Sequence, residues 1–81
     1  MMNQLTQADR DKALQIALEI KGFKSGVVEF SSMNRKHVRD LTDDEKEFLF
    51  AMALHTAPYT RRPTPEEKDL LQKCLERASV A

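Results

Sequence analysis

The sequence predicts an all-α fold, a small bundle of three main helices at about 7–21, 43–57 and 65–78. Two observations carry this prediction. First, three threonines are each followed three residues later by an acidic residue, which is the pattern of a capping box that starts a helix. Second, the run 48–54 contains seven apolar residues and would have no polar face on a helix, so we expect it to be buried.

The length of 81 residues predicts one small helical domain over 1–81, near the lower size limit for a chain that folds alone. The only cysteine, Cys74, excludes an internal disulfide, and two histidines offer little for a metal site. The first residues lack a basic stretch followed by an apolar one, so we expect no signal peptide and a cytoplasmic protein. Oligomerisation is then the main remaining means of stabilising a thin core.

The first helix is expected to begin after Thr6, with Asp9 as the acidic member of its capping box, and to end at Gly22. Its apolar positions form an arc wide enough to contact two neighbouring elements. These positions are Ala13, Leu14, Ile16, Ala17, Leu18 and Ile20.

Residues 22–41 are predicted to be irregular or to contain a short β or helical segment. The stretch 27–30 is β-prone, but we find no second convincing strand in the chain to pair with it. It could pair with itself across a two-fold axis, form a minimal hairpin with residues around Phe23, or join a helix, and we favour a simply extended segment. Ser32 could cap a short helix that reaches Leu41, and this alternative stays open.

The second helix is expected to start at Thr42 and Glu45 and to stop before Pro58, and the third to start at Thr64 and Glu67. The third helix carries one compact apolar stripe. It consists of Leu70, Leu71, Cys74, Leu75 and Ala78.

The flanking helices supply about two apolar faces, whereas the run 48–54 is apolar on every side. The remaining face must be covered by residues 27–41 or by another chain. We therefore predict self-association, with Phe48, Phe50 and Met52 as a possible dimer interface.

Net charge is zero, but its distribution is uneven. Residues 21–39 hold five basic and one acidic residue, and residues 40–60 hold one basic and five acidic residues. Within the basic part, Arg35, Lys36 and Arg39 could hold the phosphates of a nucleic acid or a nucleotide. The simpler interpretation is a solvated helix face that neutralises the acidic start of the second helix.

The connector between the second and third helices holds Tyr59, Arg61 and Arg62, residue types that are enriched at binding hot spots. They are candidate partner-binding residues. The alternative, which we favour, is a constrained interhelical loop whose tyrosine lies at the edge of the core.

We find no catalytic constellation: the chain lacks a phosphate-binding glycine loop, a paired-histidine motif and a nucleophile elbow. The sequence therefore predicts a non-enzymatic regulatory or adaptor protein that binds another protein, as a homodimer, without a cofactor, a metal or a membrane. The alternative is a nucleic-acid-binding transcriptional regulator that uses the basic segment 35–39. Both remain hypotheses at this point.

Overall fold

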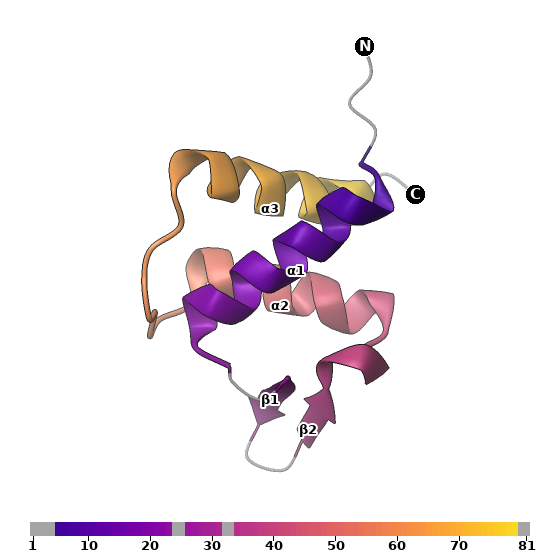
Figure 1. The fold of residues 1–81 in the computed structure, drawn as a ribbon, viewed down its shortest axis with the longest axis vertical. Coiled ribbons are helices and arrows are strands. Elements are labelled where there is room, and N and C mark those ends of the chain that lie inside the picture. The colour runs from indigo at the N-terminus through magenta and orange to yellow at the C-terminus, as the bar shows by residue number, and fades with distance from the viewer. Residues whose placement is uncertain (1–4, 24–25, 32–33, 80–81) are drawn as a thin grey trace.

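The structure, a computed structural model, describes residues 5–23, 26–31 and 34–79. Its elements in chain order are α1 (Gln7–Lys21), β1 (Val27–Ser31), β2 (Asn34–His37), the 3-10 helix η1 (Val38–Asp40), α2 (Asp43–His55) and α3 (Pro65–Ser79). The three helices pack on one another in pairs, and the two strands form an antiparallel hairpin. The hairpin and α3 lie on opposite sides of the α1–α2 pair (Figure 1).

The all-α prediction is wrong, because 27–30 belongs to a strand that has a partner within the chain. That partner, β2, places Lys36 opposite Val28 and Arg35 opposite Glu29. Its sequence Asn-Arg-Lys-His has no apolar alternation, and pairing with β1 gives it its extended conformation. The helix considered up to Leu41 is reduced to η1, and its candidate cap Ser32 lies outside the described residues.

All three capping boxes are confirmed. The Oγ1 atoms of Thr6, Thr42 and Thr64 accept hydrogen bonds from the amides three residues later. The acidic side chains at those later positions accept bonds from the threonine amides in return. At the other end of α1, Gly22 ends the helix in the left-handed region with φ of 74°, as predicted.

The core lies where the three helices meet, with one strand residue added. All six apolar positions predicted on α1 are buried, and Leu71 and Cys74 are buried on α3. Leu70 and Leu75 are half-buried, and the side chain of Ala78 lies outside the described part. The complete set of buried residues is Ala13, Leu14, Ile16, Ala17, Leu18, Ile20, Val28, Leu41, Leu49, Phe50, Ala53, Leu71 and Cys74.

The apolar run of α2 is not buried on all sides, contrary to prediction. Leu49, Phe50 and Ala53 have no exposed surface, whereas Phe48 is 53% exposed. The hairpin supplies part of the expected cover, because the ring of Phe30 on β1 lies 5.7 Å from the ring of Phe48, centroid to centroid. One edge of α2 is therefore only partly covered within the chain.

Candidate functional site

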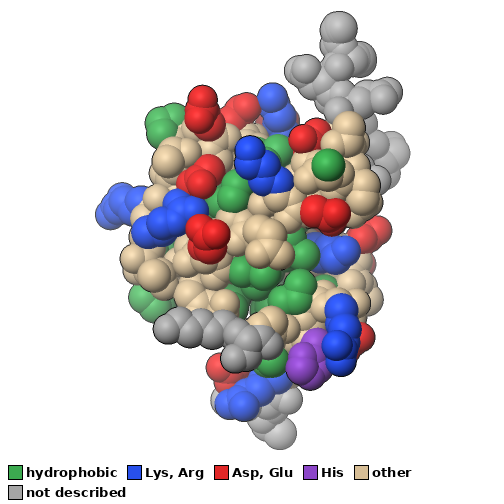
Figure 2. Space-filling view, viewed as in Figure 1, with side chains coloured by type: hydrophobic (Ala, Val, Ile, Leu, Met, Phe, Trp, Pro, Cys, Tyr) green, Lys and Arg blue, Asp and Glu red, His purple; other side chains and the backbone are tan. Residues whose placement is uncertain are grey.

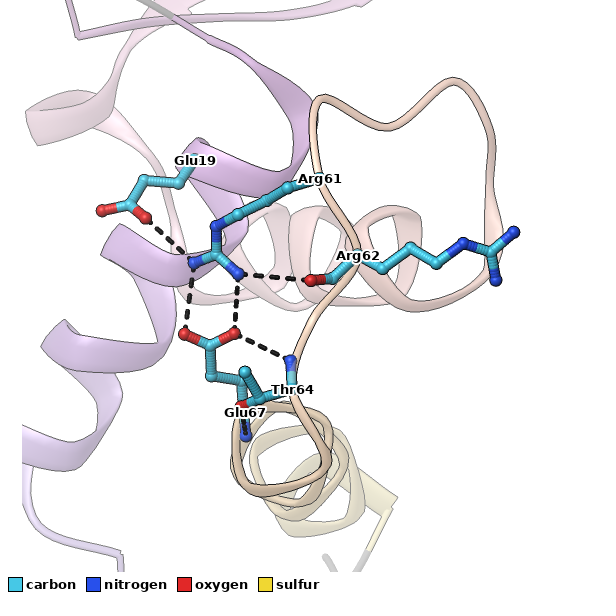
Figure 3. A network of polar contacts seen from close by, with 5 residues as sticks. All are labelled: Glu19, Arg61, Arg62, Thr64 and Glu67. Carbon is cyan, nitrogen blue, oxygen red and sulfur yellow. Dashed lines mark hydrogen bonds and ion pairs between the residues drawn. The ribbon is translucent and has the colours of Figure 1, made fainter.

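The loop between α2 and α3, which holds three candidate partner-binding residues, contains an ion-pair network that joins three segments. Arg61 donates from Nη1 and Nη2 to the two carboxylate oxygens of Glu67 on α3, at 2.7 and 3.1 Å. Nη2 also lies 2.9 Å from Oε1 of Glu19 on α1. In Figure 3 the guanidinium lies between the two carboxylates, and we call Arg61, Glu19 and Glu67 the Arg61 clamp.

The electrostatics of the Arg61 clamp are those of a strong structural contact. The hydrogen bond from Arg61, followed by that from the Thr64 amide, lowers the pKa of Glu67 from 4.5 to about 2. The hydrogen bonds to Glu67 and then Glu19 raise the pKa of Arg61 above its usual value. Because both partners are held charged at neutral pH, Arg61 is engaged within the fold.

A second contact anchors the same loop to the end of α1. Lys21 donates to the backbone carbonyls of Thr56 and Pro58, the latter at 3.0 Å, and its Nζ lies 5.2 Å from the ring centroid of Tyr59. The Thr60 amide donates to the carbonyl of Ile20 at 2.7 Å. Tyr59 packs at the edge of the core, so its surroundings fit the constrained-loop interpretation of this segment.

The remaining loop residue, Arg62, has an exposed side chain and accepts a hydrogen bond from Arg61 through its backbone carbonyl. Figure 3 shows its side chain extending away from the Arg61 clamp. Of the three loop residues predicted to bind a partner, it is the one whose side chain points into solvent.

The predicted basic cluster is divided between the two faces of the hairpin. Arg35 pairs with Glu29 across the strands at 3.3 Å, and both side chains are exposed to solvent. Lys36 instead reaches Glu45 at the start of α2, at 2.8 Å, and this bond is the main reason that the pKa of Glu45 is lowered. Arg39 is exposed in η1. The three cations therefore do not form one helix face.

An open groove lies between the hairpin and the first half of α2. Phe30 and Phe48 form its apolar part, and their rings are inclined at 45°. Asn34, Asp44 and Glu45 complete its lining, and its volume is about 280 Å³. We call these five residues the aromatic groove. Within the described part of the chain, Phe48 is the one large hydrophobic residue that is exposed.

The predicted dimer interface is only partly on the surface. Phe50 is completely buried in the protein's own core, and Met52 is half-buried against that core. Of these three residues, Phe48 alone is exposed. Successive residues of α2 point to different faces of the helix. The continuous apolar run 48–54 therefore includes residues that point into the core, and these residues are not available to a partner.

Sequence reasoning missed Phe30, Asn34, Asp44 and Glu45 as members of a site, and it used Glu45 only for a capping box. Two signals were present: Val28 and Phe30 alternate on one face of a strand, and Asp44 and Phe48 lie four residues apart on a helix. The sequence does not show that these two patterns belong to one site, because only the fold of β1 over α2 brings their residues together.

Among the residues that the structure describes, no group of three or more His, Cys, Asp or Glu side chains is placed to hold a metal ion. None of the helices within 5–23, 26–31 and 34–79 has both the length and the apolar character needed to cross a bilayer. Comparisons of the chain with protein families, curated proteins and solved structures found no match.

Proposed function

We propose that this protein is a small, non-enzymatic regulatory or adaptor protein of the cytoplasm that acts by binding another protein through the aromatic groove. The observation that carries the proposal is the 53% exposure of Phe48 beside Phe30. Large aromatic residues are enriched in protein interfaces, and an apolar patch with a polar rim is typical of a docking surface.

The size of the groove supports a protein partner over a large cofactor. Its volume of about 280 Å³ lies just below the usual range for small-molecule pockets, about 300–1,000 Å³, and it is open to solvent. Such a groove accommodates one or two side chains of a partner. The buried position of the single cysteine, Cys74, agrees with a protein that does not depend on disulfides, as is usual in the cytoplasm.

The lining also favours a particular chemistry for the partner. Asp44 is exposed at the rim, and Glu45 is held charged by Lys36. A segment with an apolar side chain next to a lysine or arginine would therefore fit the groove. The nucleic-acid alternative has weaker support, because Arg35 and Lys36 are both ion-paired within the chain.

Site-specific photo-crosslinking in the native host tests the proposal. A photoreactive phenylalanine analogue at position 48 is expected to give specific crosslinked protein products. The same analogue at position 62, an exposed loop position away from the groove, serves as the matched control. Equal products from both positions, or none from position 48, would contradict the proposal.

A further inference from the structure

We propose that the aromatic groove receives an arginine side chain of a different protein, with the guanidinium against the ring of Phe48 and beside the carboxylate of Asp44. This inference rests on the proposed function, because it names the residue of the partner that enters the same groove. The charges of the lining, the spacing of these two residues on α2 and the size of the groove support the assignment.

The charged residues that line the groove are both acidic. Asp44 and Glu45 lie in the first turn of α2, and the lining that the structure describes includes no lysine or arginine. Lys36 neutralises Glu45 in an ion pair of 2.8 Å. Asp44 is exposed, and within 5–23, 26–31 and 34–79 its carboxylate makes no ion pair. The groove therefore presents an unpaired negative charge beside an apolar wall.

The nearby basic residues do not reverse this sign. Lys46 follows Asp44 by two positions on α2, so it points to nearly the opposite side of the helix. Arg35 pairs with Glu29, on the face of the hairpin opposite to Lys36. A cation is therefore the complement of this lining, whereas a phosphate is not. A second copy related by a two-fold axis would bring two acidic linings together, so we assign the groove to a different protein.

Phe48 and Asp44 are placed to contact one cationic group together. They lie four residues apart on α2, a spacing at which the Cβ atoms are about 5–6 Å apart. Helical side chains lean toward the N-terminus of their helix, so the ring of Phe48 leans toward the turn that holds Asp44. This ring is partly open to solvent, because Phe48 is 53% exposed, and the ring of Phe30 continues the apolar wall at 5.7 Å.

Arginine fits these neighbours better than lysine does. Its guanidinium is planar and weakly hydrated, so it can stack on an aromatic ring while its edge donates to a carboxylate. The ammonium of lysine is compact and strongly hydrated, and in an open groove it keeps more of its water. The volume of about 280 Å³ accommodates an arginine together with an apolar neighbour from the same segment.

Three short peptides test which side chain enters the groove. The probes are acetyl-Leu-Arg-Leu-amide and the same peptide with lysine or citrulline, the neutral isostere of arginine, at the central position. NMR titration of the full chain at about 50 mM salt and up to about 20 mM peptide covers the affinity of a single anchoring residue. We expect shifts at the aromatic groove and binding of the arginine peptide at least about fivefold tighter than the citrulline peptide, with the lysine peptide between them.

Two variants and a matched control locate the contact. Asp44→Asn removes the unpaired charge and is expected to reduce the preference for arginine over citrulline to about twofold or less. Phe48→Leu keeps an apolar side chain but removes the ring, and it is expected to abolish the advantage of arginine over lysine. Asp43→Asn is the control, because it makes the same change at the neighbouring exposed position, which does not line the groove. It should keep both preferences.

Several results would overturn the inference. They are equal binding of the arginine and citrulline peptides, equal binding of the arginine and lysine peptides, shifts outside the groove, and no saturable shift. Groove shifts that grow with the concentration of the chain alone would show a second copy in the groove and would also overturn it. If circular dichroism shows that Asp44→Asn does not fold, the wild-type chain decides: about 500 mM salt should weaken the arginine peptide and leave the citrulline peptide unchanged.

The outcomes separate this inference from the proposed function. Crosslinking from position 48 to a host protein, without any preference for arginine among the peptides, would sink the inference and leave the proposed function standing. A preference for arginine without crosslinked products from position 48 would contradict the proposed function, while the chemistry assigned to the groove would hold.

Discussion

Replacing Glu67 by glutamine is expected to destabilise the fold by breaking the Arg61 clamp while keeping the start of α3. The carboxylate of Glu67 accepts two bonds from Arg61 and one from the Thr64 amide. A glutamine side chain retains an oxygen that can accept the Thr64 bond, because glutamine also serves in capping boxes. The substitution therefore removes mainly the charge that faces Arg61.

The size of the effect follows from the exposure of the two partners. The side chain of Glu67 is 22% exposed and that of Arg61 is 37% exposed, so water screens the pair in part. Hydrogen bonds to charged groups contribute about 1.5–3 kcal/mol and exposed ion pairs about 0.2–1 kcal/mol, so we expect a loss of about 1–2 kcal/mol in the free energy of unfolding. For a domain of this size that loss lowers the melting temperature by about 5–15 °C.

Thermal and urea unfolding at pH 7, followed by circular dichroism at 222 nm, measures this loss. Glu66→Gln is the matched control, because it makes the same charge change in the same exposed helical turn. The pKa of Glu67 is lowered to about 2, so its contribution is complete above pH 4.5 and is lost as the pH falls toward 2. Equal losses for both variants at pH 7, or a Glu67→Gln difference that persists unchanged at pH 2, would refute the reasoning.

Three further predictions concern the α1 turn, the hairpin and nucleic acid. Gly22→Ala is expected to cost more than Gly26→Ala in denaturant unfolding, because both glycines have positive φ but only a Cβ at Gly22 clashes with the Oγ1 of Thr60. The left-handed conformation alone costs about 1–2 kcal/mol, so equal losses would contradict the clash. Lys36→Met should raise the pKa of Glu45 toward 4.5, measured by NMR titration, and an unchanged pKa would refute their coupling. In gel shifts the full chain should show no DNA or RNA binding below about 100 μM at about 50 mM salt, and tighter binding would favour the alternative function.

The sequence was a good guide where local rules decide the structure. Thr6, Thr42 and Thr64 each sit three residues before an acid, and hydrogen bonds of that range form within one helical turn. The apolar arc of α1 could also be predicted from the sequence, because the spacing of its residues depends only on helix geometry.

The hairpin and the aromatic groove were not predictable in this way. The polar sequence of β2 gives no strand signal, and its extended state depends on β1 beside it. Phe30 and Phe48 lie 18 positions apart in sequence, and only the fold of the hairpin over α2 brings their rings together. The Arg61 clamp likewise joins Glu19 to residues more than 40 positions later.

Two of the capping boxes have a consequence for the cooperativity of folding. Glu45 and Glu67 each accept the bond from their threonine amide and also bind a cation from an earlier segment, Lys36 or Arg61. Fraying of the first turn of α2 therefore also releases a contact to the hairpin, and fraying of the first turn of α3 releases a contact to the interhelical loop. Because one carboxylate serves both contacts, we expect the first turns and their partner segments to open together in hydrogen exchange, as single cooperative units.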